Sequence, residues 1–133
     1  MFSWMRSQAE PTRPILDHSY LARLSQFIGE AETWELLADG MLELTERLAR
    51  ARHLAAAEDV AELSRLLHDI TGTAGHLGLS ALSSEAAIGQ RALAQDAKCT
   101  AVLDPLLALE DPSMNALKAY CRDEQAGSAD NPE

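Results

Sequence analysis

Apolar residues recur every three or four positions along most of the chain, which is the spacing of a helix with one buried face. The pattern predicts a first helix over about residues 16–27, ended by Gly29, and a long second helix over about residues 31–57. A third helix is expected to begin near Glu58 and to end at about Leu77. Leucine and alanine supply most of the apolar residues, while valine and isoleucine are scarce, so the expected fold class is all-α.

The second half of the chain predicts further helices joined by short connections. Gly78 suits the end of the third helix, and Ser80 can cap a fourth. Asp104-Pro105 and Asp111-Pro112 each resemble an N-cap before a proline at the first helical position, so one broken helix or two short helices both fit. Because short connections make neighbouring helices antiparallel, we expect an up-down antiparallel four-helix bundle with a short additional N-terminal helix.

The two ends of the sequence have a different composition. Residues 1–14 carry two prolines among mixed polar residues, and residues 124–133 are mostly polar or small. Such segments bury little apolar surface. We therefore expect flexible tails at residues 1–14 and 124–133 around a bundle at residues 15–123.

Composition and charge narrow the possible partners. The chain has 133 residues, of which 47% are hydrophobic, so it can bury one core as a single domain. Its formal net charge of −10 repels nucleic acid and anionic membrane surfaces. No stretch resembles a signal peptide or a membrane span. Cys99 and Cys121 lack the spacing of a zinc site, which favours reduced thiols and a cytoplasmic protein.

The stretch "LLHDITGTAGHLGLSAL", residues 66–82, places a histidine opposite the apolar face of the third helix. At 100° per residue, the apolar residues form a stripe roughly 120° wide, and His68 lies about 140° from its centre. The members of the stripe are Val60, Leu63, Leu66, Leu67, Ile70, Ala74 and Leu77. We therefore expect the imidazole of His68 to be exposed to solvent.

The residues around His68 on this face are mostly small. The neighbours at three and four positions, and beyond, are Ser64, Arg65, Thr71, Gly72 and Gly75. Each helical glycine costs roughly 1 kcal/mol relative to alanine, and the open surface would let a partner's backbone approach the histidine. No histidine, cysteine or carboxylate stands four residues away to complete a metal site, so we predict a nucleophile and no bound metal.

The same stretch resembles the histidine-containing phosphotransfer (HPt) domains of multistep two-component phosphorelays, whose pattern is roughly H-x-L-K-G-[SA]-[SA]-x-x-[LIV]-G. The matching residues are His68, Ile70, Gly72, Thr73, Ala74, Leu77 and Gly78. The resemblance extends over about residues 15–122. It implies that His68 accepts a phosphoryl group on Nε2 from an aspartyl phosphate and passes it to another aspartate.

The resemblance also implies the partners. The donor would be the receiver domain of a hybrid histidine kinase and the acceptor that of a response regulator, with this chain a monomer without kinase activity. Magnesium would sit in the receiver, and no cofactor is expected here. The implied contact surface is Ala61, Ser64, Gly72, Gly75 and Leu79, with Asp69 and His76 beside it. His18 and His53 are expected to be solvated surface residues.

Two positions near His68 need separate interpretation. Family members often carry a glutamine about 22 residues after the histidine that hydrogen-bonds Nδ1, and Gln90 stands there; it can equally be a polar flank residue. The family's lysine three residues after the histidine is Thr71 here, whose hydroxyl can donate one hydrogen bond. We expect Arg65 to supply the lost charge, so that Arg65→Ala slows transfer much more than Arg47→Ala.

Two other functions remain open from the sequence. Asp69 directly after His68 is similar to the H-[ED] start of sensor kinase dimerisation helices, which indicates a dimeric histidine phosphotransferase or kinase-type bundle. Gly72 and Thr73, however, stand where those helices usually have Thr or Asn followed by Pro. A helical adaptor that binds a partner through the glycine-lined face without carrying phosphate is the third possibility.

Overall fold

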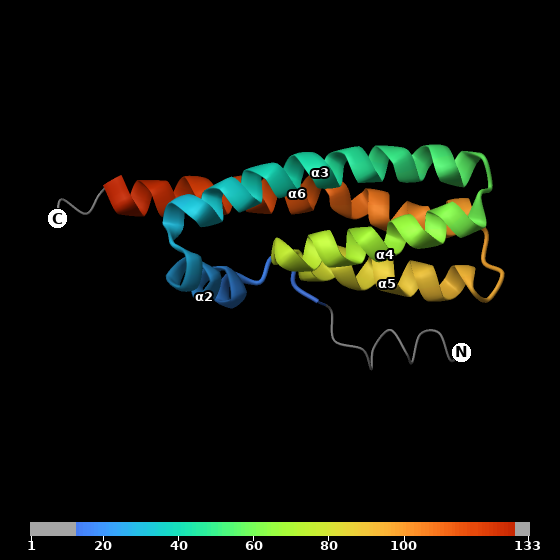
Figure 1. Cartoon of the computed structure of the whole chain (residues 1–133), viewed down its shortest axis with the longest axis horizontal. Coiled ribbons are helices and arrows are strands. Elements are labelled where there is room, and N and C mark those ends of the chain that lie inside the picture. The colour runs from blue at the N-terminus through green and yellow to red at the C-terminus, as the bar shows by residue number, and fades with distance from the viewer. Residues whose placement is uncertain (1–12, 130–133) are drawn as a thin grey trace.

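The computed structural model describes residues 13–129, which form five helices and no strand (Figure 1). The helices are α2 (His18–Ile28), α3 (Glu30–Ala56), α4 (Val60–His76), α5 (Ser80–Leu93) and α6 (Cys99–Ala129). The predicted all-α class is confirmed. None of the described helices is both long and apolar enough to cross a membrane.

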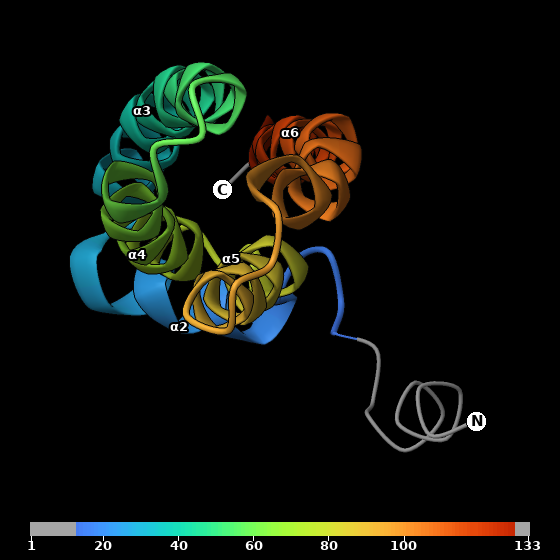
Figure 2. The same ribbon diagram turned by 90° about the vertical axis from the view of Figure 1, so that its right-hand side faces the viewer.

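Helices α3 to α6 form the bundle, and successive helices run in opposite directions (Figure 1). The end-on view in Figure 2 shows the four helices around a common centre, with α4 diagonally opposite α6. α3 and α5 each pack against both α4 and α6, whereas α2 packs against α3 at one end. The predicted up-down bundle with a short extra N-terminal helix is therefore present, and α4 keeps one face toward solvent.

Local capping explains where several helices begin and end. The carboxylate of Asp17 accepts a hydrogen bond from the Tyr20 amide (3.0 Å) at the start of α2. Asp59 does the same for the Glu62 amide (3.2 Å) at the start of α4. Gly29 ends α2 with a φ of +96°, which favours glycine over other residues, so its predicted role as a helix end is confirmed.

Leucine supplies most of the buried core. Burial of such a side chain stabilises the fold by roughly 1.5–3 kcal/mol before the entropic cost of ordering the chain. The largest fully buried residues are Leu21, Leu37, Leu44, Leu48, Leu63, Leu67, Ile70, Leu77, Leu79, Leu82, Leu106 and Leu117. Val60 differs from the predicted stripe because it is the first residue of α4 and stays 46% exposed.

The turn between α4 and α5 is held by the N-terminal part of the chain. Gly78 adopts a φ of +74°, and its carbonyl accepts a hydrogen bond from the Asp17 amide (2.8 Å). The Tyr20 hydroxyl donates to the carbonyl of His76 (3.0 Å), and the Ala81 amide donates to that of Pro14 (2.9 Å). These bonds fix the end of α4 relative to α2.

The start of α5 differs from the prediction. Leu79 rather than Ser80 is the N-cap residue, and no side chain within residues 13–129 caps this end. The amide of Ala81 instead donates to the carbonyl of Pro14, so a backbone acceptor from the preceding segment replaces the expected serine hydroxyl.

α6 also differs, because it continues through Pro105 and Pro112 as one helix. A proline inside a helix costs about 3 kcal/mol, and it leaves the carbonyl four residues earlier without its hydrogen-bond donor. Those carbonyls belong to Ala101 and Ala108, which are exposed, so water can bond them. The opposite face buries Val102, Leu103, Leu106, Met114 and Leu117 against the bundle, which outweighs the cost of two prolines.

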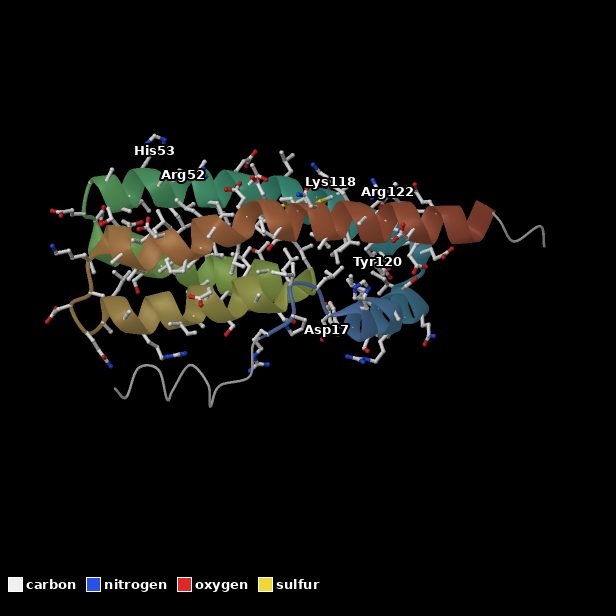
Figure 3. All side chains as sticks on the ribbon, turned by 180° about the vertical axis from the view of Figure 1, so that it is seen from behind. Asp17, Arg52, His53, Lys118, Tyr120 and Arg122 are labelled. Atoms are coloured by element: carbon white, nitrogen blue, oxygen red, sulfur yellow. The ribbon has the colours of Figure 1, made fainter. Side chains whose placement is uncertain are left out.

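The last helix is longer than the sequence led us to expect. α6 runs to Ala129, so residues 124–129 extend the helix where a tail was expected. Residues 1–12 and 130–133 lie outside the described residues, and the tails predicted there stay predictions. On the back of the bundle, Arg52 of α3 pairs with Glu110 of α6 at 3.0 Å (Figure 3 labels Arg52).

Candidate functional site

His68 lies near the middle of α4, and its side chain is exposed. Leu66 and Leu67 directly before it, and Ile70 two residues after it, are buried in the core. These neighbours fix the backbone of His68 while the imidazole projects away from the bundle. The exposed position predicted from the helical periodicity is confirmed.

The glycines beside His68 are open to solvent. A Cβ atom built on Gly72 would meet no atom within 4 Å, and one on Gly75 would meet only the Ser83 hydroxyl at 3.6 Å. Packing therefore does not require glycine at either position. Gly78 is different, because its φ is positive and a Cβ atom there would lie only 3.2 Å from Leu21, and both features favour glycine. Its predicted role as the helix end is confirmed.

A groove of about 430 Å³ lies between α3 and α4 beside His68. We call it the α3/α4 groove. Its lining residues are Leu36, Asp39, Gly40, Glu43 and Arg47 of α3 together with His68, Asp69, Gly72, Thr73, His76 and Leu77. The helices come close here, since a Cβ on Gly40 would overlap the side chain of Leu77. The groove therefore has a floor of Gly40 and Leu77 under a polar rim.

The rim of the α3/α4 groove is predominantly acidic. Asp39, Glu43 and Asp69 contribute carboxylates, and Arg47 is the cation among the lining residues. Arg47 is committed to neighbours: it pairs with Glu43 at 2.6 Å and donates to the Thr73 hydroxyl across the helix interface. Arg47 therefore lines the same groove as His68, a position that helix spacing within α4 could not reveal. Arg47→Ala is therefore unsuitable as a control for Arg65→Ala, because Arg47 lies close to His68.

A second hollow, of about 410 Å³, lies on the other side of α4, between α4 and α5. We call it the α4/α5 hollow. It is lined by Arg13, Thr71, Gly75, Ser80, Ser83, Ser84, Ala87 and Arg91. The Ser83 hydroxyl bridges the two helices by donating to the carbonyl of Thr71 at 2.9 Å. His68 thus stands on a ridge of α4 between two concave surfaces.

Thr71 faces the α4/α5 hollow rather than the α3/α4 groove. Its hydroxyl donates to the carbonyl of Leu67 at 2.8 Å, one turn back along α4. This bond occupies the proton that we expected Thr71 to donate to a ligand. Threonine is also uncharged, so position 71 supplies no cation to the site.

Arg65 and Gln90 are the other two predicted supporting residues. Arg65 pairs with Glu62 at 2.5 Å, and its side chain is 75% exposed, so solvent screens its charge. Gln90 lies half-buried on α5. No hydrogen bond joins it to His68 in the part of the chain that the structure describes. The roles of both residues stay predictions.

Most of the residues predicted to contact a partner lie at the surface around His68. Ala61, Asp69, Gly75 and His76 are exposed, and Ser64 is half-buried. Leu79 is wrong as a contact residue, because its side chain is fully buried. It lies beyond the end of α4, where the chain turns into α5, so the helical wheel of α4 no longer describes its direction.

Within residues 13–129, no group of three or more histidine, cysteine, aspartate or glutamate side chains is arranged to hold a metal ion. Residues 32–120 match the family model described as Hpt domain. The searches of curated proteins and of solved structures returned no significant match.

Proposed function

This chain belongs to the Hpt domain family, whose members carry out histidine phosphotransfer in two-component systems, and on that premise we propose that His68 is the phosphoacceptor. The observation that supports this assignment best is the exposed imidazole of His68 on a helix anchored by buried leucines, next to the open surface at Gly72. A receiver domain can thus reach the imidazole without displacing a side chain at that glycine.

The transfer needs no other reactive group from this chain. The lone pair of Nε2 attacks the phosphorus of an aspartyl phosphate, an N–P bond forms, and the P–O bond to the aspartate breaks, which releases its carboxylate. The proton on Nδ1 stays in place during the attack. In the second half of the relay, a carboxylate of another receiver domain attacks the same phosphorus and the N–P bond breaks. Positioning and charge stabilisation are the protein's contribution.

Hpt domains interact with receiver domains, and we propose that two of them use the exposed face of α4 in turn. One would belong to a hybrid histidine kinase and the other to a response regulator. The surface around Ala61, Gly72 and Gly75 would admit the receiver, with Asp69 and His76 at its margin. We propose a monomer that requires no cofactor of its own, with magnesium bound by the receiver.

Gln90 remains our proposed partner for Nδ1 of His68. Its position 22 residues after His68, on the adjacent helix α5, supports the proposal. A hydrogen bond from Nδ1–H to the Gln90 side-chain oxygen would leave Nε2 as the free lone pair.

The location that we propose is the cytoplasm. Cys99 and Cys121, the two cysteines of the sequence, are both free thiols, which fits a reducing compartment.

The experiment is phosphoryl transfer from a phosphorylated receiver domain in the absence of ATP. The wild-type protein should gain phosphate that is stable in base and labile in acid, and His68→Gln should gain none. His53→Gln is the matched control, because His53 is exposed on α3 away from both concave surfaces (Figure 3) and should label normally.

The outcomes separate the three functions considered from the sequence. Transfer without ATP supports the phosphorelay. Labelling only with ATP and a kinase catalytic domain would instead support the kinase-type bundle. Absence of labelling with every receiver and kinase would favour the adaptor that binds without carrying phosphate.

A further inference from the structure

The α4/α5 hollow is positively charged, although the chain as a whole is acidic. The whole sequence carries a formal net charge of −10, yet the described residues that line the hollow include two arginines and no acidic residue. Ser80 and Ser84 add hydroxyl donors beside Arg13 and Arg91, whereas the hydroxyls of Thr71 and Ser83 donate to backbone carbonyls. Guanidinium and hydroxyl donors are the groups that bind a tetrahedral oxyanion.

Of the two arginines, Arg91 is the one that lies on a helix of the bundle. The ion pairs found among the described residues engage Arg47, Arg52 and Arg65, and none engages Arg91. Arg91 also projects from α5, whose position against α4 is fixed by the bond from the Ser83 hydroxyl to the Thr71 carbonyl. Its guanidinium is therefore free to bind a ligand that enters between α4 and α5.

The α4/α5 hollow lies on the same face of α4 as His68, while His68 itself lines the α3/α4 groove. Thr71 and Gly75 form the α4 side of the hollow, and they follow His68 by three and seven residues, which places them on the same face within two turns. Gly75 contributes no side chain, so nothing from that position fills the space between His68 and α5. A phosphoryl group bonded to Nε2 would therefore stand between the α3/α4 groove and the α4/α5 hollow.

The two sides of His68 differ sharply as surroundings for a phosphoryl dianion. On the α3 side it would approach Asp39, Glu43 and Asp69, while Arg47 is already paired with Glu43. On the α5 side it would meet the arginines and hydroxyls of the α4/α5 hollow. Like charges repel and a guanidinium fork binds two phosphoryl oxygens at once, so the α5 side is favoured.

We propose that the α4/α5 hollow is an oxyanion site for the phosphoryl group carried by His68, with Arg91 as its principal cation; this inference rests on the proposed function of His68. Arg91 thereby supplies, from α5, the positive charge that is missing at Thr71, which lines the same hollow. Arg91 is better suited to bind the phosphoryl group than Arg65, because Arg65 is paired with Glu62 and does not line the hollow.

The test uses phosphoramidate, a small phosphoryl donor, so that receiver docking does not enter the result. The imidazole displaces ammonia from phosphoramidate and forms the same N–P bond. Initial rates and the ³¹P chemical shift of the product are measured for wild type, Arg91→Ala, Arg91→Lys and Arg65→Ala. Arg122→Ala is the matched control, because Arg122 is exposed on α6, diagonally opposite α4 (Figures 2 and 3).

Arg91→Ala should react roughly tenfold more slowly than wild type, as the loss of a hydrogen bond to a charged group implies, and its ³¹P shift should move toward that of free phosphohistidine. Arg91→Lys should recover most of the rate, since it keeps the charge. A purely structural role of Arg91 would leave the ³¹P shift of the phosphorylated protein unchanged.

Equal rates and shifts for Arg91→Ala and Arg122→Ala would overturn the inference, and so would a loss confined to Arg65→Ala. Failure of the proposed function looks different: the wild-type protein would not be labelled at all, or His68→Gln would be labelled equally. Normal labelling of His68 with an unaffected Arg91→Ala would reject the oxyanion site alone.

Discussion

At the scale of single residues, the surface around His68 is shaped by what is missing from it. Gly72 and Gly75 have room for a side chain, and the fold would accept one at either position. Gly40, on the floor of the α3/α4 groove, has no such room, because Leu77 occupies the space. Two glycines therefore weaken α4 without any benefit to packing, whereas a third is required by the close approach of α3 and α4.

The first residue-scale prediction concerns Gly72→Ala. Because a Cβ there meets nothing, alanine should raise the free energy of unfolding by about 0.5–1 kcal/mol, the usual difference between glycine and alanine inside a helix. Phosphoryl transfer from a receiver domain should become slower, since the methyl group stands beside His68. Urea denaturation and initial transfer rates measure the two effects.

Gly40→Ala is the matched comparison, and it should destabilise the protein by about 1–3 kcal/mol because the methyl group overlaps Leu77. Equal destabilisation by Gly72→Ala and Gly40→Ala would contradict this prediction, because it would mean that a side chain at position 72 disturbs the packing.

Helical periodicity located His68 correctly on the exposed face but could not identify what flanks it. Thr71 and Arg65 lie about 60° to either side of His68 on the wheel, and sequence spacing does not say which neighbouring helix each side meets. The fold turns Thr71 toward α5 and brings Arg47 and Arg91 in from other helices. Residues that approach from another helix are determined by packing between helices, which the spacing within α4 does not encode.

At the scale of helices, α6 shows most clearly how tertiary packing overrides local preference. Pro105 and Pro112 each follow an aspartate, which is a common helix start, yet both lie inside one helix. The buried face of α6 is continuous across them, and that continuity determines the outcome. The other helices begin or end within about two residues of the positions expected from glycines and acidic caps, because in those places local capping and packing agree.

The element-scale prediction is that Pro105→Ala stabilises the protein. In the interior of a helix, alanine restores a backbone hydrogen bond and is favoured over proline by up to about 3 kcal/mol. If Pro105 were instead the first residue of a separate helix, where proline is well tolerated, the gain would be a few tenths of a kcal/mol at most. Denaturation midpoints of the two proteins distinguish these cases.

At the scale of the whole molecule, α2 and the end of α6 close one end of the bundle. The rings of His18 and Tyr120 lie 5.9 Å apart, and Figure 3 shows Tyr120 on α6 on the side of α2. Burial raises the pKa of Tyr120 above its usual 10.0, and the negative charge of Glu124 raises it further. The folded protein therefore holds this phenol proton more tightly than the unfolded chain does.

This gives a whole-molecule prediction about alkaline pH. Well below pH 10.0 the phenol is protonated in both states, so Tyr120 does not make stability depend on pH. As pH rises through 10.0 the unfolded chain ionises first, so stability falls until the folded pKa is passed. Tyr120→Phe should lose stability less steeply above pH 10.0 in thermal unfolding. Burial also raises the pKa of the Cys121 thiol above its usual 9.0, so this thiol too lowers stability at alkaline pH. Both proteins contain Cys121, so its effect cancels when they are compared at the same pH. Parallel curves for the two proteins would contradict the assignment.

The ridge of α4 that carries His68 separates a concave surface with three acidic residues from one with two arginines. The electrostatic potentials on the two sides have opposite signs, so they rotate an approaching charged partner before it makes contact. At physiological ionic strength the screening length is about 8 Å, close to the width of one helix, so the rotation occurs only in the final step of the encounter. A partner with the reversed charge pattern would be rejected for its angle of approach, even if it carried the same reactive group.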